Sequence, residues 1–422
     1  MPAPGMYSGI TTDDAMNLAM SAKAVPLYNA VKEFIANEVE PVTEKYFALG
    51  EGRPDRWQYG EGQLELLDEL KRKARAKGLW NFFLPNSETG EGLSNLDYAY
   101  IAVELGKNPI ASESMNCSAP DTGNMEVLER VGTPEQKEKW LKPLLAGEIR
   151  SAYAMTEPDV ASSDAKNLEC RAELDGEEWL INGEKYYISG AGDPRCKIMI
   201  CMLLTSPDAP PHKRHSQILV PMDTPGVKIL GPMEVFGEDD APHGHMHLRF
   251  TDVRVPASNM LLGEGRGFEI SQVRLGPGRI HHCMRWIGIC ERALGMMCDR
   301  AIERELNPGH SLAMQQTIQN WNAESAAEIK ASRLLVLNTA HKIEKDGAKA
   351  AKEDISTIKF FVSDVLMKVV DRAIQVHGGL GITDDTLLSF WYRHERGARI
   401  YDGPDEVHKT VLAKSILKSR RG

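Results

Sequence analysis

The chain has 422 residues, of which 42% are hydrophobic, and a formal net charge of −10 at pH 7. Single hydrophobic cores rarely grow past roughly 250 to 300 residues, so a chain of this length predicts two or three domains. The acidic balance makes nucleic acid a poor candidate partner, because a polyanion would repel the chain. Its apolar runs all fall short of the roughly 20 residues that a membrane-spanning helix needs, so we expect no membrane span.

The cysteines and the N-terminus bear on the compartment. There are seven cysteines, an odd number, and none of them form a Cys-x-x-Cys pair. This usage argues against a disulfide framework and favours a reducing environment. The N-terminal segment carries Asp13 and Asp14 and little basic charge, which is not typical of an export signal or transit peptide. We therefore expect a cytoplasmic protein.

Residues 1–150 have the pattern of a helical domain. Ser94 precedes an apolar stretch that ends at Gly106, as expected for a capped helix. In residues 133–136 (Thr-Pro-Glu-Gln) the threonine can cap a helix, the proline can occupy its first position, and the glutamine can complete a capping box. We expect the buried stripe of this helix to contain these residues: Trp140, Leu141 and Leu144.

Residues 151–258 have the pattern of a β-domain. Apolar residues alternate with polar ones between 168 and 174, and the expected core-facing set is Leu168, Cys170, Ala172 and Leu174. Two turn signals, Asp175-Gly176 and Asn182-Gly183, flank a short apolar strand. Further strands are predicted at 197–204, 216–221 and 245–250.

Long amphipathic helices return in residues 259–422, at 318–343 and 355–376. The order helices, strands, helices predicts a mainly α architecture with an inserted β-domain. The predicted domains are therefore 1–150, 151–258 and 259–422.

Three segments that lie far apart in the sequence suggest one flavin site. They are residues 153–158 (Tyr-Ala-Met-Thr-Glu-Pro), 183–190 (Gly-Glu-Lys-Tyr-Tyr-Ile-Ser-Gly) and 399–406 (Arg-Ile-Tyr-Asp-Gly-Pro-Asp-Glu). Together with residues 131–148, these segments resemble the acyl-CoA dehydrogenase family, and the resemblance covers nearly the whole chain. It implies a helical domain, a β-barrel or sandwich, a four-helix bundle, and FAD as the cofactor.

The resemblance implies flavin contacts in the middle of the chain. In the family the Thr-Glu-Pro turn holds the pyrimidine edge of FAD, which implicates Met155 and Thr156, and Ser163 belongs to the same signature. Tyr187 stands where the family usually has Trp beside the isoalloxazine, and Ser189 where it usually has the Thr that hydrogen-bonds flavin N5. The alternatives are a solvated turn and ordinary half-buried strand tyrosines.

Further cofactor contacts are implied in the last third of the chain. Arg304 matches the arginine that reaches the FAD pyrophosphate across a subunit interface, and Gln375, Gly379 and Glu406 are also assigned to the cofactor. This role for Arg304 requires at least a homodimer, so a homodimer or homotetramer is expected. An arginine on a solvated helix face is the alternative.

Asp402 occupies the position of the glutamate that serves as the base in many family members. The resemblance implies that Asp402 removes the α-proton of an acyl-CoA thioester while the β-hydride goes to FAD, leaving an α,β double bond. Electron-transferring flavoprotein is the implied electron acceptor.

Three further strings, at 119–126, 275–285 and 403–408, closely resemble the dehydrogenase domain of acyl-CoA dehydrogenase family members ten and eleven. That subgroup uses Asp as the base and is associated with catabolism of 4-hydroxy acids through 4-phosphorylated acyl-CoA. Arg279, His281 and Arg285 could direct basic groups toward such a substrate. An arginine that anchors a loop and histidines that pack on a helix are an equally weighted alternative.

Two other functions stay open at this point. An Asp base also fits a flavin oxidase of a small carbon acid, similar to nitroalkane oxidase. A flavin-bearing binding protein would need a basic C-terminal surface. The sequence offers only a small cluster of lysines and arginines after residue 413 in support of such a surface. His243, His245 and His247 alternate as metal ligands on a strand might, but we expect no metal site.

Overall fold

The computed structural model describes residues 17–420, apart from the side chains of residues 273 and 275–278. The chain divides into two compact units. The helical unit comprises Met1–Asn37, Gly92–Ala111 and Arg279–Gly422, and the sheet unit comprises Glu38–Glu91 and Ser112–Gly278. Each unit therefore combines stretches that are separate in the sequence, and the domain boundaries at 150 and 258 stay predictions.

Long helices make up most of the helical unit. They are α1 (Ala24–Phe34), α4 (Asn95–Gly106), α10 (Gln316–Asp346), α11 (Lys352–His377), α12 (Leu387–Glu395) and α13 (Asp405–Ser419). α9 (Gly267–Glu303) begins in the last residues of the sheet unit and continues into the helical unit. Short elements connect them: β8 (Glu305–Asn307), β9 (His310–Ser311), η7 (Gly378–Ile382) and η8 (Arg396–Arg399).

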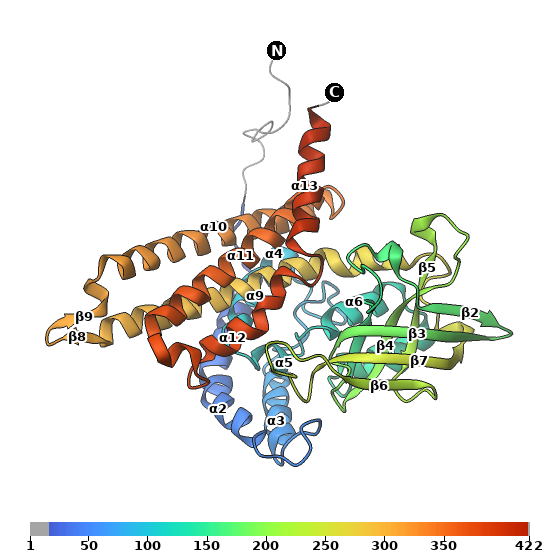
Figure 1. Ribbon diagram of the computed structural model, residues 1–422, viewed down its shortest axis with the longest axis horizontal. Helices are drawn as coiled ribbons and strands as arrows, with labels where there is room; N and C mark the ends of the chain where they lie inside the picture. Colours follow the sequence, from blue (N-terminus) through green and yellow to red (C-terminus); the bar gives the residue numbers. More distant parts are fainter. Residues whose placement is uncertain (1–16, 421–422) are drawn as a thin grey trace. The chain divides into compact units, whose positions relative to one another are not determined.

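α11 is the central helix of this unit, since it packs on α10, α12 and α13. α10 and α11 lie side by side in Figure 1, and α10 also packs on α4. The helices predicted at 318–343 and 355–376 are confirmed as α10 and α11. The N-terminal prediction at Ser94 is confirmed as well, because its side chain accepts a hydrogen bond from the main-chain N–H of Asp97 and caps α4.

α4 and α9 touch where glycines remove the side chain. A Cβ on Gly288 would lie 2.0 Å from the main-chain oxygen of Val103, and one on Gly106 would lie 2.2 Å from that of Arg285. No side chain fits at such distances, so both glycines are required for this close approach. The contact fixes the part of α9 around Arg285 against α4.

The sheet unit is built on a seven-stranded sheet (Figure 1). Its strands are β1 (Arg150–Ala154), β2 (Arg171–Asp175), β3 (Glu178–Ser189), β4 (Cys196–Leu204), β5 (His215–Pro221), β6 (Val227–Pro232) and β7 (His245–Pro256). Their order is β1-β4-β2-β3-β7-β6, with β5 paired to β4. Apolar side chains of the strands form one buried core that includes Ala152, Ile181 and Phe250. The strands predicted at 197–204, 216–221 and 245–250 are confirmed as parts of β4, β5 and β7.

Helices of the N-terminal part complete this unit, namely α2 (Glu40–Leu49), α3 (Gln63–Ala76) and α6 (Asp121–Val131). The capping box at Thr133 is confirmed, because its side chain and that of Gln136 bond each other's main-chain N–H groups. The helix that follows is not continuous. It consists of α7 (Pro134–Gln136), the π-helical η2 (Lys137–Leu141) and α8 (Lys142–Leu145). Of the expected buried stripe, Leu141 and Leu144 are buried but Trp140 is partly exposed.

Two details of the predicted β-domain are wrong. Leu174 is 57% exposed, because it lies one residue before the end of β2, next to the hairpin turn at Asp175-Gly176. Asn182-Gly183 is not a turn, since β3 continues through it and only its register with β7 shifts there. A Cβ on Gly183 would lie 2.8 Å from Sγ of Cys170, so this glycine serves a bulge with a close neighbour rather than a turn.

Candidate active site

Asp402 lies in the loop between η8 and α13 of the helical unit. Its φ of +53° is in the left-handed region, which aspartate tolerates better than most residues. Its main-chain oxygen accepts hydrogen bonds from Nε and Nη2 of Arg279, at 3.3 and 3.2 Å, and from Nε2 of His408, at 3.1 Å. A Cβ on the next residue, Gly403, would lie 2.7 Å from Nε2 of His408. The backbone around Asp402 is therefore held in one conformation.

A fully buried lysine on α11 holds the same loop. Nζ of Lys359 donates to the main-chain oxygens of Ala398, at 2.7 Å, and Gly403, at 3.2 Å. The same ammonium lies 5.6 Å from the ring centres of Trp286 and Tyr401, a cation–π distance. Burial lowers the pKa of Lys359 below its ordinary value. Sequence reasoning missed this lysine, because nothing in a helical pattern separates a buried lysine from an exposed one.

The carboxylate of Asp402 is held by a histidine on α9. Nε2 of His282 lies 3.1 Å from Oδ2 of Asp402, and the two side chains are 17% and 22% exposed. The imidazole stacks on Trp286, with 6.0 Å between the ring centres. Burial and the neighbouring Arg285 lower the pKa of His282, which favours the neutral ring. His282 thus presents a neutral imidazole to a carboxylate that stays partly exposed.

The residues predicted for substrate binding are placed in two ways. Arg279 reaches the main-chain oxygen of Asp402, and Nη2 of Arg285 reaches Nδ1 of His282, so both belong to the surroundings of Asp402. His281 is buried instead, with its ring edge-to-face on Tyr98 at 4.5 Å between centres. Burial lowers the pKa of His281 to about 3. Of the two adjacent histidines, His282 is therefore the one beside the carboxylate.

A buried ion pair anchors the Thr-Glu-Pro segment (residues 156–158) of the sheet unit. Nζ of Lys185 lies 2.8 Å from Oε1 of Glu157 and also donates to the main-chain oxygen of Met155 at 3.0 Å. The main-chain N–H of Tyr186 donates to the oxygen of Thr156 at 2.8 Å. Glu157 is 7% exposed, so the segment differs from a solvated turn. Its conformation is fixed by β3.

Tyr187 and Ser189 follow on the same strand. The register of β3 with β7 shifts between Lys185 and Ile188, and at this bulge Tyr187 takes a φ of +56° and leaves half of its surface exposed. Left-handed conformations of bulky residues are costly and are concentrated at functional sites. Oγ of Ser189 lies 2.8 Å from Nδ1 of His245. An exposed aromatic face two residues from a hydroxyl fits the stacking surface and the donor that a flavin needs.

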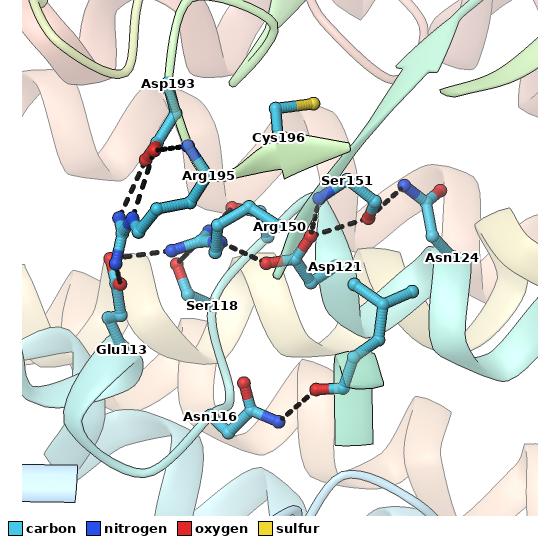
Figure 2. A network of polar contacts seen from close by, with 12 residues as sticks. Glu113, Asn116, Ser118, Asp121, Asn124, Arg150, Ser151, Asp193, Arg195 and Cys196 are labelled. Carbon is cyan, nitrogen blue, oxygen red and sulfur yellow. Dashed lines mark hydrogen bonds and ion pairs between the residues drawn. The ribbon is translucent and has the colours of Figure 1, made fainter. Parts of the chain in front are cut away.

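A network of buried charges supports β1, the strand that leads into this segment (Figure 2). Arg150 pairs with Glu113, at 2.6 Å, and with Asp121, while Arg195 pairs with Glu113, at 2.6 Å, and with Asp193, at 2.7 Å. Burial would raise the pKa of Glu113, but the arginines hold it well below its ordinary value. The network ties the start of β1 to the segments that carry these carboxylates.

The other residues predicted for cofactor binding are all exposed: Ser163, Arg304, Gln375, Gly379 and Glu406. Ser163 belongs to the sheet unit, and the other four to the helical unit. Within the part of the chain that the structure describes, no group of three or more His, Cys, Asp or Glu side chains is arranged to hold a metal ion. None of the described helices is long and apolar enough to cross a membrane.

The sheet unit also has an open hollow with a volume of about 450 Å³. Basic side chains on its wall are Lys166 and Arg214, and apolar ones include Leu168, Leu204 and Pro207. Glu169 is an acidic residue on the same wall, so the hollow combines two cations and one carboxylate with apolar surface.

Three family models cover most of the chain. They describe the acyl-CoA dehydrogenase N-terminal domain, matched by residues 23–148, the middle domain, matched by 152–253, and the C-terminal domain, matched by 265–417. The solved structure of an acyl-CoA dehydrogenase from Mycobacterium abscessus superposes with a TM-score of 0.92 at 45% identity, covering 95% of this chain and 100% of that one. The chain belongs to the acyl-CoA dehydrogenase family, and the predicted three-domain fold is confirmed.

The curated relatives define the subgroup more narrowly. Acyl-CoA dehydrogenase family member 11 of Rattus norvegicus is 47% identical over 95% of this chain and 51% of its own length, and family member 10 of Mus musculus is 48% identical over 93% and 37%. FadE2 of Mycobacterium tuberculosis, also named as an acyl-CoA dehydrogenase, is 46% identical over 96% of this chain and 98% of its own. The resemblance to family members ten and eleven is thus confirmed, and the chain spans about half the length of the first of these relatives.

One further structure contains the cofactor. An acyl-CoA dehydrogenase of Bacillus anthracis, solved as a complex with FAD, is similar with a TM-score of 0.80 at 25% identity, covering 98% of this chain and 70% of that one.

Proposed function

We propose that this chain is an FAD-dependent acyl-CoA dehydrogenase in which Asp402 is the base. The carboxylate of Asp402 takes the α-proton of the acyl thioester, the β-carbon loses a hydride, and the two carbons form a double bond. Bound FAD would supply the acceptor for that hydride and for the two electrons that the hydride carries. Electron-transferring flavoprotein is the proposed next acceptor, as is usual in the family.

The observation that supports this proposal most strongly is the set of hydrogen bonds that fixes the loop around Asp402. An aspartate is one methylene shorter than the glutamate usual at this position, so the place of its carboxylate depends closely on where the main chain of this loop lies. Arg279, His408 and Lys359 all bind main-chain oxygens of this loop. A rigidly held carboxylate that stays partly exposed is what a general base requires.

The flavin contacts are proposed for the middle domain. The anchored main chain at Met155 and Thr156 would hold the pyrimidine edge, Tyr187 would stack beside the ring, and the Ser189 hydroxyl would donate to N5. The relative from Bacillus anthracis that was solved with FAD supports this cofactor. Ser163 and Glu406 are proposed as further contacts.

An oligomer is proposed because of the residues around Arg304. This arginine is exposed beside Ile302 and Leu306, which are 66% and 51% exposed. Exposed apolar side chains next to a cation are typical of a surface that another subunit covers. We infer a homodimer or homotetramer in which Arg304, Gln375 and Gly379 reach the flavin of another copy.

The proposed substrate is an acyl-CoA with a hydroxyl or phosphate on carbon 4. The likeness to family members ten and eleven supports this substituent, and Arg279 and Arg285 beside Asp402 supply positive charge near the base. The hollow that Lys166 and Arg214 line is proposed to take phosphate groups of the CoA moiety.

An anaerobic absorbance titration tests this function. Protein loaded with FAD is titrated with 4-phosphopentanoyl-CoA, and unsubstituted pentanoyl-CoA is the control. Bleaching of the flavin band by the phosphorylated thioester alone is the expected result, while bleaching by both would mean a general short-chain enzyme. A yellow protein that bleaches with neither thioester, but consumes oxygen with a small nitroalkane, would be an oxidase. Failure to take up FAD would contradict the proposal altogether.

A further inference from the structure

Three side chains on one face of α9 converge on Asp402. Arg279 binds its main-chain oxygen, His282 binds its carboxylate through Nε2, and Arg285 binds the other ring nitrogen of His282. Positions 279, 282 and 285 are three residues apart, so successive helical turns bring them to the same side. The result is a chain of contacts that runs from Arg285 through His282 to Asp402.

The chemistry of these groups determines where the proton of His282 is. A guanidinium can only donate hydrogen bonds, so Nδ1 of His282 has to accept the one from Arg285. A neutral imidazole carries a single N–H group, which must then be on Nε2. Nε2 faces Oδ2 of Asp402 at 3.1 Å, and His282 therefore donates to the carboxylate.

We propose that Arg285 holds His282 in the Nε2–H tautomer, and that His282 is thereby a positioning residue that orients the Asp402 carboxylate and stabilises its charged form. This inference rests on the proposed function, in which Asp402 is the base. His282 does not relay the proton onward, because its second nitrogen is occupied by Arg285. The proton that Asp402 takes from the substrate therefore does not pass through His282.

The charged and titratable groups around the cluster are consistent with a neutral His282. They are Arg279 and His281 on α9, Lys359 on α11, Glu395 on α12, Tyr401 in the loop and His408 on α13. Burial would raise the pKa of Glu395, but His394 and Arg285 hold it below its ordinary value. Glu395 therefore stays charged and balances Arg285, while Lys359 opposes a second positive charge on His282.

The backbone beneath Arg285 makes the arrangement rigid. Gly106 of α4 packs directly on the main-chain oxygen of Arg285, and Gly288 packs on Val103 one turn later. Arg285 and His282 lie three residues apart on α9, so the helix itself keeps the two side chains within reach of each other, and the contact with α4 fixes this part of α9.

Histidine tautomers in the folded protein provide the first test. Protein with ¹⁵N-labelled histidine is studied by NMR at neutral pH, and the His282 signals are assigned by their loss in His282→Gln. We expect a proton on Nε2 and none on Nδ1, with the tautomers mixing in Arg285→Met. A proton on Nδ1, or on both nitrogens, in the wild-type protein would overturn the proposal. This measurement needs no substrate, so failure of the proposed function is distinguishable from failure of this inference.

The pH dependence of flavin reduction by acyl-CoA provides the second test. His282→Leu removes the donor, whereas His282→Gln keeps an N–H that can reach Asp402. We expect the acid limb to move up by about one pH unit in His282→Leu, because a hydrogen bond to the charged carboxylate is lost. His282→Gln is expected to restore the wild-type acid limb. An unshifted limb in His282→Leu, in protein that melts at the wild-type temperature, would refute the positioning role.

Discussion

Glu126 on α6 is a carboxylate buried in the sheet unit, 3% exposed. Its Oε2 has no hydrogen-bond partner among the described residues. Burial raises its pKa to about 8, against the opposing effects of Arg130 and Arg274. The folded protein therefore holds a proton on Glu126 at pH values where the unfolded chain has released it.

This shift predicts that Glu126→Gln is more stable than the wild type in alkaline solution. Because the pKa of Glu126 is raised in the folded state, its protonated carboxyl group contributes stability that is fully present below the unfolded pKa of about 4.5. This stability is lost as pH rises toward about 8, by at most ~1.4 kcal/mol per pH unit. Glutamine has the shape of the neutral acid and no charge to bury. Melting temperatures from about pH 5 to about pH 9 check this, and we expect the two curves to diverge as pH rises.

The difference between the two curves isolates Glu126, because every other group titrates in both proteins. Glu138→Gln is the matched control, since Glu138 is exposed and forms an i,i+4 pair with Lys142. That control should follow the wild type closely at all pH values. Parallel curves for Glu126→Gln and the wild type would show that Glu126 is charged in the folded protein.

A local helix cap was predictable from the sequence, whereas the partners of the residues around the site were not. The Thr133 capping box depends on residues three apart, and the pattern alone was sufficient. His282, Lys185 and Lys359 bind partners that are between 28 and 120 positions away in the chain. No local pattern indicates such partners, so the surroundings of Asp402 became visible only in the folded structure.

At the scale of the elements, α4 and α9 pack closely at Arg285, where the two glycines Gly106 and Gly288 allow the contact. Gly288→Ala would place a Cβ 2.0 Å from the main-chain oxygen of Val103, so the helices would have to move apart. We expect a loss of about 1–3 kcal/mol or more in the free energy of unfolding. Chemical denaturation of the two proteins measures this loss.

Gly295→Ala on the same helix is the control. A Cβ there has no neighbour within 4 Å among the described atoms, and alanine is the better helix former. This variant should be more stable than the wild type, by about 0.5–1 kcal/mol. Equal effects of the two substitutions would mean that the close approach of α4 and α9 contributes nothing to stability.

Elements with a strong internal pattern were predicted better than their interruptions. α10 and α11 and the strands β4, β5 and β7 follow their hydrophobic periods. The sequence at Gly183 is typical of a turn. The strand continues past it because β3 pairs with β7 on both sides of the bulge. The π-helical η2 likewise precedes Pro143, whose missing N–H breaks the regular helix there.

At the scale of the whole molecule, the family was predictable because its motifs are spread over all three domains. The matched family models and the relatives at 46–48% identity agree with that prediction. The proposed reaction assigns the flavin contacts to the middle domain and the base to the C-terminal domain. Its roles therefore have to be tested in the complete chain with FAD bound.

The most direct test is anaerobic reduction of the FAD-loaded protein by acyl-CoA, with wild type and Asp402→Asn compared. Asparagine keeps the size of the side chain but cannot take a proton, so we expect a bound, yellow flavin whose reduction slows by about 10²- to 10⁴-fold. Dithionite should reduce both proteins alike, which controls for flavin binding. Reduction of Asp402→Asn at the wild-type rate would contradict the assignment of Asp402 as the base.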